Sequence, residues 1–282
     1  MLFRSHGVPR WYDNADALIN DNEVDAVYVA TPPSSHKQYA LMTARAGKPV
    51  YVEKPMALNF AECTSMVDAC RDAGVPLFVA YYRRALPRFL KVKELLESGA
   101  IGVVRFVNIN FHQPAGIATD PAALPWRVRP DVSGGGLFVD LASHMLDFLD
   151  FALGPIREVR GFASNLAHRY PAEDIVTGTF RFESGVHGAG VWCFSAFDKR
   201  DFTEIVGTAG RISYATFDST PIALSTPAGT TEFPIDNPPH IQQPMIQLIV
   251  DDLNAIGTSP SNGETAARTS WVMDQMLAGV HR

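Results

Sequence analysis

The sequence predicts an α/β unit with a doubly wound parallel sheet, followed by an α+β unit with an open-faced, predominantly antiparallel sheet that carries helices on one face. Short apolar runs alternate with amphipathic helical patterns up to about residue 85, which is the order of strands and crossover helices in a parallel sheet. Beyond that point, consecutive strand-like segments joined by tight turns indicate an antiparallel sheet. We therefore expect two domains, residues 1–85 and residues 86–282.

The first domain contains three predicted strands that alternate with predicted helices. The run Val50-Tyr51-Val52 is apolar or aromatic throughout, as a strand buried on both faces of a parallel sheet requires. Pro55 cannot donate to a strand ladder, so this strand ends near Lys54. The other expected strands are 25–30 and 75–82, and the expected helices are 14–20, 37–46 and 60–73.

The second domain begins with a predicted helix at 87–98 and a half-exposed strand at 102–111. An irregular, proline-rich segment at 112–135 follows, and a loop of this length inside a compact protein is usually functional. After an amphipathic helix at 137–153, the expected strands are 157–163, 175–183, 186–194, 202–207, 211–214 and 230–235. The chain closes with helices at 243–256 and 264–278, and we expect the second of them to pack back on the first domain.

Composition and charge exclude several classes of protein. Apolar residues make up 46% of the chain and charged residues 19%, as in ordinary globular proteins. The net charge of −6 and the scattered basic residues argue against nucleic-acid binding. Every apolar stretch is far shorter than the roughly 18 residues of a membrane span. Only three cysteines and no apolar signal segment are present, which indicates a reducing, cytoplasmic location.

Lys54 is the first candidate functional residue, because it lies at the carboxyl end of the strand predicted at 50–52. Ligands of open α/β sheets bind at this edge, and a lysine there can donate to a substrate oxygen. A solvated lysine in front of a turn is the alternative that the local sequence leaves open.

A second candidate site begins at three consecutive glycines, residues 134–136, which permit close approach of a ligand. Asp140 and His144 are four residues apart on the following helix, so they share one face at about 6 Å. A carboxylate beside an imidazole favours a general base that acts near neutral pH, and Asp147 is placed to join the same face. A surface ion pair and a pair of metal ligands are alternatives, but no Cys/His cluster completes a metal site, so we predict none.

Several motifs in a fixed order resemble those of the Gfo/Idh/MocA family, named after glucose-fructose oxidoreductase and inositol dehydrogenase. Their combined order and spacing are specific, whereas each motif alone is not. The matching segments are 27–36, 47–55 with Glu53-Lys54-Pro55, 82–87 with Tyr82-Arg83-Arg84, 99–102, Trp126-Arg127 and 134–147. The resemblance extends to the C-terminal helix.

This resemblance implies an NAD(P)-binding Rossmann domain in residues 1–85 and a substrate-binding and oligomerisation domain in residues 86–282. It also implies a dehydrogenase or reductase that transfers a hydride between the nicotinamide of NAD or NADP and a sugar-, cyclitol- or dihydrodiol-type substrate. The expected partners are therefore a small-molecule substrate and further copies of the chain, in a homodimer or homotetramer.

The resemblance also implies roles for individual residues. Lys54 matches the lysine that contacts the reacting oxygen, and Asp140 and His144 match the acidic and His/Tyr positions of the substrate pocket. In the implied catalytic mechanism, His144 exchanges the hydroxyl proton, Lys54 stabilises the developing oxyanion, and Asp140 orients substrate and imidazole. The implied cofactor contacts are Thr31, Pro32, His36, Glu53, Lys54, Tyr82, Trp126 and Arg127. Tyr82 departs from the Asn or His that many relatives carry there.

The sequence departs from the family pattern at its start, because it contains no Gly-x-Gly-x-x-Gly turn. In the family this turn places the pyrophosphate at a helix N-terminus, and about fifty residues of the usual βαβ units have no counterpart here. We therefore expect an N-terminally truncated Rossmann sheet with strand 25–30 at an exposed edge, and an incomplete cofactor site. A truncated gene model, a divergent protein and an edge covered by another subunit all fit, and we favour the first. The alternative function is a non-catalytic binding or regulatory relative that has lost dinucleotide binding.

Overall fold

The first sheet consists of three short parallel strands. A computed structural model of the chain describes residues 7–8, 10–116 and 123–279. The strands are β1 (Val27–Val29), β2 (Val50–Val52) and β3 (Leu77–Val79), in this order. The helices of this part of the chain are α2 (Ala15–Ile19), α3 (His36–Arg45) and α4 (Phe60–Asp72). The predicted doubly wound parallel sheet is confirmed, and β1 is its outer strand within the described residues.

The second sheet is larger and mixed. Its strands lie in the order β11-β10-β9-β8-β4-β7-β6-β5, and neighbouring strands are antiparallel except β4 and β7. The strands are β4 (Val104–His112), β5 (Ile156–Ser164), β6 (Ile175–Phe182), β7 (His187–Cys193), β8 (Arg200–Gly207), β9 (Arg211–Tyr214), β10 (Ile222–Thr226) and β11 (Gly229–Phe233). The predicted open-faced, predominantly antiparallel sheet is confirmed. Of the strands named here, β10 alone was not predicted. Its three apolar residues are followed by polar ones, so the apolar run is too short to indicate a strand.

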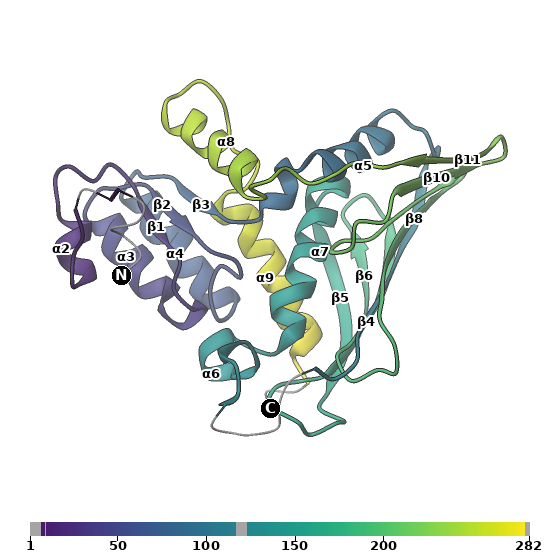
Figure 1. Ribbon diagram of the computed structural model, residues 1–282, viewed down its shortest axis with the longest axis horizontal. Helices are drawn as coiled ribbons and strands as arrows, with labels where there is room; N and C mark the ends of the chain where they lie inside the picture. Colours follow the sequence, from purple (N-terminus) through teal and green to yellow (C-terminus); the bar gives the residue numbers. More distant parts are fainter. Residues whose placement is uncertain (1–6, 9, 117–122, 280–282) are drawn as a thin grey trace.

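Two long helices, α7 (Leu137–Leu153) and α9 (Gly263–Leu277), lie between the two sheets (Figure 1). α7 packs on the inner face of the second sheet, where Phe138 contacts Trp192 with ring centres 5.2 Å apart. α9 packs along β5, and a Cβ on Gly161 would lie only 2.6 Å from the Cα of Met276. Glycine is therefore required for this close approach of helix and strand.

α9 also contacts the helices of the first sheet, so the end of the chain connects the two parts of the protein. The thiol of Cys63 in α4 donates to Ser270 Oγ at 3.3 Å. The N–H of Phe60, at the start of α4, donates to Asp274 Oδ2 at 2.8 Å.

Two further helices contribute side chains to the buried apolar clusters beside the two sheets. Phe89 of α5 (Pro87–Glu97) contacts Tyr214 of β9, with ring centres 6.1 Å apart. Met245 of α8 (Gln243–Leu253) joins the buried cluster on one face of the first sheet. In the described ranges, no helix combines the length and the apolar character needed to cross a membrane.

A buried ion pair fixes the connection between the first sheet and α7. β3 leads into the short helix η2 (Tyr82–Ala85), whose Arg84 donates to both carboxylate oxygens of Asp147, at 2.7 and 2.9 Å. Both side chains are almost fully buried, so loss of one partner typically costs about 3–5 kcal/mol. Asp147 therefore does not join Asp140 and His144 as the helical spacing suggests, because Arg84 holds its carboxylate.

In the segment predicted as irregular, 112–135, the described residues contain more regular structure than predicted, and residues 117–122 lie outside the described residues. It includes two short helical turns, η4 (Trp126–Val128) and α6 (Pro130–Ser133). Proline is favoured at the first positions of a helix, where a missing N–H costs nothing. Gly134 ends α6 at φ +83°, and a Cβ there would lie 2.3 Å from the carbonyl oxygen of Leu58. This glycine is therefore needed both for its backbone conformation and for the contact with Leu58, in the segment before α4.

A buried carboxylate from another segment holds the start of α7. Gly136 precedes the helix and has no side chain to cap it, but its N–H donates to Glu173 Oε1 at 2.7 Å. Glu173 is fully buried, and its Oε2 has no hydrogen-bond partner among the residues that are described. Burial raises the pKa of Glu173 from 4.5 to about 7, although the bond from Gly136 lowers it.

The substitution Glu173→Gln should therefore stabilise the protein at alkaline pH. Because the folded-state pKa of Glu173 is raised, its neutral form stabilises the fold below about pH 4.5, and this contribution is lost as the pH rises through about 7. The free energy of unfolding of the parent should fall, relative to the variant, by up to about 3 kcal/mol over this range. Urea unfolding at acidic and at alkaline pH measures the difference.

The exposed Glu183, which pairs with Arg157 on the surface, provides a matched control. Glu183→Gln should show no such pH dependence relative to the parent. A parent that is as stable as Glu173→Gln, or more stable, at alkaline pH would contradict a buried, costly charge at this position.

Candidate active site

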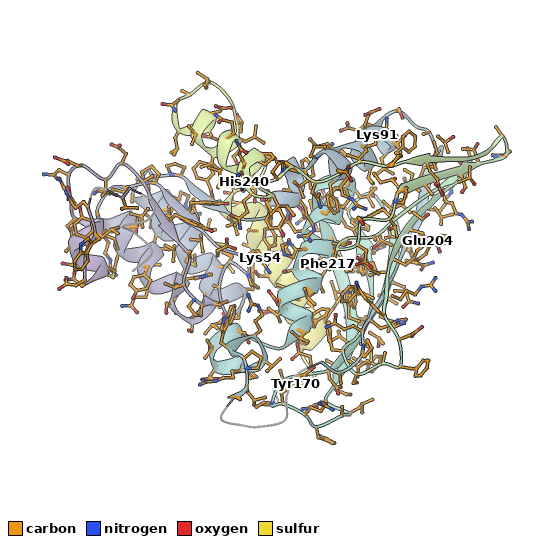
Figure 2. All side chains as sticks on the ribbon, in the orientation of Figure 1. Lys54, Lys91, Tyr170, Glu204, Phe217 and His240 are labelled. Atoms are coloured by element: carbon orange, nitrogen blue, oxygen red, sulfur yellow. The ribbon has the colours of Figure 1, made fainter. Side chains whose placement is uncertain are left out.

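Lys54 joins the first sheet to α7. It follows β2 at the carboxyl edge of the sheet, and its Nζ donates to Asp140 Oδ1 at 2.6 Å and to the Asp140 carbonyl oxygen at 3.1 Å. Only about 15% of the Lys54 side chain and 14% of the Asp140 side chain are exposed. Lys54 lies between the first domain and α7 (Figure 2). The structure thus brings together two of the three residues with an implied catalytic role.

Asp140 binds a second cation with its other carboxylate oxygen. Arg127 Nε lies 3.2 Å from Asp140 Oδ2, and its guanidinium lies over the Trp126 ring at 4.5 Å from the ring centre. Arg127 is half-exposed and is one of the implied cofactor contacts. The η4 turn brings its guanidinium to the carboxylate of Asp140. Sequence reasoning did not find this contact, because it joins a loop to a helix.

His144 lies one helical turn beyond Asp140, in an aromatic environment. Its ring is 3% exposed and lies 5.3 Å from the Tyr82 ring and 5.9 Å from the Phe217 ring, centre to centre. Within the described parts of the chain, His144 Nδ1 has no hydrogen-bond partner. The expected Asp140–His144 contact does not form, because Lys54 and Arg127 occupy the two oxygens of Asp140.

The environment of His144 favours its uncharged form. Burial lowers its pKa well below 6.5, and the positive charges of Arg83 and Lys54 lower the pKa further. The expectation of a base whose pKa lies near neutral is therefore wrong, because no carboxylate of the described residues pairs with this ring. A neutral imidazole at neutral pH remains a proton acceptor.

His36 has a structural position rather than a place open to a ligand. It is fully buried, and its Nε2 lies 2.7 Å from the Thr31 carbonyl oxygen while its Nδ1 lies 3.1 Å from that of Pro55. His36 therefore connects the turn after β1, which contains Pro32, with the turn after β2 through these two contacts. Both turns lie at the carboxyl edge where ligands of such sheets bind.

Glu53 links that edge to the start of α8. Its carboxylate accepts from the Tyr28 hydroxyl, from Gln242 Nε2 at 2.9 Å and from the Lys54 N–H at 3.1 Å. With three donors already bound, Glu53 fixes the backbone that presents Lys54.

The same edge offers polar groups that fit the nicotinamide end of a dinucleotide. Thr31 Oγ1 is buried and, among the described residues, has no hydrogen-bond partner. Lys54 and Tyr82 follow the neighbouring strands β2 and β3. For a metal, in contrast, the described chain contains no group of three His, Cys, Asp or Glu side chains placed to hold an ion.

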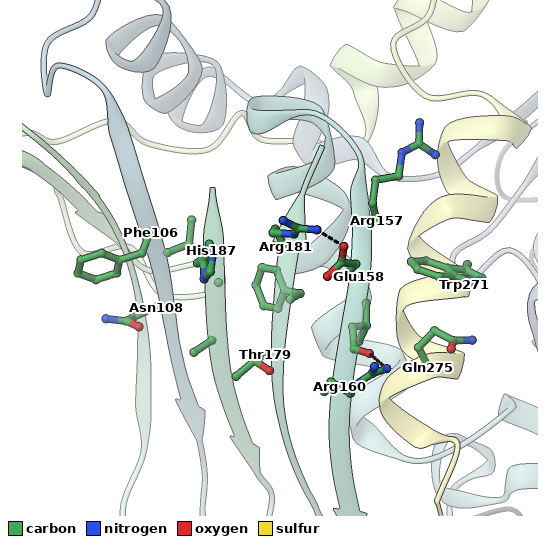
Figure 3. A pocket seen from close by; sticks show the side chains of 15 residues that line it. Phe106, Asn108, Arg157, Glu158, Arg160, Thr179, Arg181, His187, Trp271 and Gln275 are labelled. Atoms are coloured by element: carbon green, nitrogen blue, oxygen red, sulfur yellow. Dashed lines mark hydrogen bonds and ion pairs between the residues drawn. The ribbon is translucent and has the colours of Figure 1, made fainter. Parts of the chain in front are cut away.

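A cavity of about 780 Å³ lies away from these residues, on the second sheet beside α9 (Figure 3). Phe106 and His187 from the sheet and Trp271 from α9 are among its lining residues. None of the three candidate catalytic residues lines it, so the candidate active site is the region around Lys54 at α7.

Comparisons with known proteins agree with the fold. The family profile of the GFO/IDH/MocA C-terminal domain matches residues 89–213, and the profile described as "Oxidoreductase family, NAD-binding Rossmann fold" matches residues 2–81. The chain is 38% identical to Oxidoreductase P35 of Formosa agariphila, over 95% of this chain and 83% of that protein. It is 32% identical to myo-inositol 2-dehydrogenase of Thermotoga maritima, over 79% of this chain and 66% of that protein.

A solved structure shows the same fold. Levoglucosan dehydrogenase in complex with NADH and levoglucosan superposes with a TM-score of 0.87 at 22% identity, over 98% of this chain and 83% of that one. Two matching family profiles and a relative that is 38% identical over most of both chains are sufficient for an assignment. The chain belongs to the Gfo/Idh/MocA family of NAD-binding Rossmann oxidoreductases.

Proposed function

We propose that this chain is an NAD(P)-dependent dehydrogenase or reductase that transfers a hydride between the nicotinamide and a CH–OH carbon of a sugar-, cyclitol- or dihydrodiol-type substrate. One observation carries the proposal: Lys54 and Asp140 meet at 2.6 Å, one helical turn from the buried, neutral ring of His144. An ammonium donor and a proton acceptor are the groups that such a reaction needs at its oxygen. Relatives named as inositol and levoglucosan dehydrogenases support the substrate class.

The proposed catalytic residues have separate roles at the substrate hydroxyl. In the oxidative direction, the neutral imidazole of His144 accepts the hydroxyl proton. Lys54 donates a hydrogen bond to the same oxygen and stabilises its negative charge as the proton leaves. Asp140 holds Lys54 in place with one carboxylate oxygen and Arg127 with the other. The chemistry that a bound nicotinamide supplies is acceptance of the hydride from the carbon.

The cofactor side of the proposed site lies at the ends of the three parallel strands. We assign direct nicotinamide contacts to Thr31, Pro32, Lys54 and Tyr82. His36 is buried behind this edge, Glu53 is partly buried there, and both hold the turns that form it. The implied contacts of Trp126 and Arg127 remain part of the proposal, at the side where Arg127 approaches Asp140.

The proposed cofactor site is incomplete in the 282 residues, because they contain no Gly-x-Gly-x-x-Gly turn for the pyrophosphate. The second candidate function is a non-catalytic small-molecule-binding or regulatory relative that has lost dinucleotide binding. Titration of the purified chain with NADH and NADPH, followed by nicotinamide fluorescence, separates the two. Micromolar binding would contradict both an incomplete cofactor site and the second candidate function.

We propose that the outer face of the second sheet binds a second copy of the chain, in a homodimer or homotetramer. Large apolar side chains point outward from this face: Phe162 is 82% exposed, Val191 40% and Phe106 39%. Larger exposed apolar patches often mark protein–protein interaction sites. In light scattering, the parent should have the mass of a dimer or a larger assembly. Phe162→Asp should reduce the mass of this assembly. A monomeric parent would contradict the proposal.

We further propose a reducing, cytoplasmic location. Cys63, Cys70 and Cys193 are all free thiols. Burial raises the pKa of Cys63 to about 12 and that of Cys70 to about 11, which keeps both thiols protonated and unreactive.

The substitution Lys54→Met tests the proposed function. Because it removes the donor at the developing oxyanion, kcat should fall by about 10²–10³-fold. The assay follows nicotinamide absorbance with NAD or NADP and a panel of sugars, cyclitols and dihydrodiols.

Lys93→Met is the matched control, since Lys93 of α5 contacts Glu97 and the Phe151 ring but none of the three candidate catalytic residues. It should leave kcat unchanged. If Lys54→Met retains the turnover of the parent, Lys54 has a structural role and the assigned mechanism is wrong.

A further inference from the structure

Arg83 is a buried cation without a carboxylate partner. It is 5% exposed, and no Asp or Glu of the described residues lies within ion-pair distance of its guanidinium. The neighbouring Arg84 is equally buried but binds Asp147 through two hydrogen bonds. A buried charge is costly unless it is paired, so the protein maintains the Arg83 charge at an energetic cost.

The contacts of Arg83 are weak for so deeply buried a guanidinium. Its Nε and Nη2 both donate to the Thr216 carbonyl oxygen, each at 3.3 Å. Its Nη1 has no hydrogen-bond partner in the described part of the chain. Its remaining neighbours are aromatic, with the guanidinium carbon 4.6 Å from the Phe217 ring centre and 5.0 Å from that of Tyr82.

Arg83 and His144 share these two aromatic neighbours. The His144 ring contacts Tyr82 at 5.3 Å and Phe217 at 5.9 Å, the same rings over which Arg83 lies. In such an environment of low dielectric constant, a cation acts on a nearby ionisable group more strongly than it does in water.

The carboxylates near this cluster are bound elsewhere and form no ion pair with Arg83, although the charge of Asp201 favours its charged form. Asp140 binds Lys54, and Asp147 binds Arg84. Asp201 of β8 accepts the backbone N–H groups of residues 216, 217 and 218.

The other ionisable groups that face His144 are Lys54 and two tyrosines. Lys54 is an additional positive charge, but Asp140 binds it directly. Tyr81 approaches the His144 ring edge-on at 6.3 Å between ring centres, and burial raises its pKa well above 10, so it is neutral. Tyr82 contributes its ring. Arg83 is therefore the unpaired charge of this environment.

We propose that Arg83 is a positioning residue whose buried charge, which no carboxylate pairs, adds to the effect of burial and so helps to keep His144 uncharged until a substrate proton is transferred. The catalytic consequence rests on the proposed function: a proton that His144 takes from a substrate hydroxyl is held weakly beside Arg83 and is passed on readily. This provides a reason for retaining an unpaired arginine beside a site that must accept and release a proton.

NMR titration of His144 in the full chain tests the proposal without substrate or cofactor. The ring Cε1–H signal is assigned by its loss in His144→Asn and is followed from alkaline to acidic pH. In the parent the signal should stay at the neutral-ring position through the whole range in which the protein remains folded. In Arg83→Met the ring should become protonated at a higher pH than in the parent, so that its signal begins to move within the range in which the variant remains folded. Arg83→Lys, which keeps the charge, should behave like the parent.

Two further variants make the result decisive. Arg83→Gln retains a donor for the Thr216 carbonyl without the charge, and it replaces Arg83→Met if that variant does not fold. Arg105→Met removes one charge from an exposed position of β4 and should leave the His144 signal unchanged.

An unchanged His144 titration in the uncharged variants, or an equal upward shift in Arg83→Lys, would overturn the proposal. The outcome is independent of the proposed function, because the titration needs no turnover. In an active enzyme, the acid limb of the kcat profile should move in the same direction as the His144 midpoint.

Discussion

The ion pair between Lys54 and Asp140 is the contact on which the rest of the site depends, because it brings residues from two separate sheets to one point. Pro55 ends β2 and leaves Lys54 at the carboxyl edge of the first sheet, while the first turn of α7 places Asp140 opposite it, with 2.6 Å between Nζ and Oδ1. The pair is partly shielded from water. Its attraction is therefore stronger than that of an exposed pair, and its desolvation penalty is smaller than that of a fully buried pair. Since Asp140 also binds Arg127, it organises two cations and leaves His144 without a carboxylate.

The position of Asp140 in turn depends on how firmly α7 is held. Glu173 accepts the N–H that precedes the helix, and Arg84 from the end of the first sheet binds Asp147 in its interior. Further along, Asp150 binds Arg268 of α9 at 2.6 and 2.8 Å. Each contact comes from a different segment, so α7 is fixed relative to both sheets, and the geometry at Lys54 follows from this arrangement. This arrangement includes several buried charges, among them the charge of Arg83, which no carboxylate pairs.

Much of this arrangement was predictable from short stretches of sequence. The apolar run 50–52 followed by Pro55 predicts a strand with Lys54 at its carboxyl end, and three glycines before an amphipathic helix predict the start of α7 near Asp140. Periodicity and turn residues carry this information locally. The missed features are long-range: spacing alone places Asp140 beside His144, whereas the fold gives both Asp140 oxygens to Lys54 and Arg127. The burial that makes His144 neutral and leaves Arg83 unpaired likewise depends on residues more than fifty positions away.

A double-mutant cycle in kcat/KM tests most directly whether Lys54 and Asp140 act as one unit. The cycle compares the parent, Lys54→Met, Asp140→Leu and the double variant, under one set of substrate and cofactor conditions. If Asp140 acts by holding Lys54, the double variant should lose about as much activity as the more damaged single variant. Losses that multiply in the double variant would show that the two residues act independently, and would contradict the central place given to their ion pair.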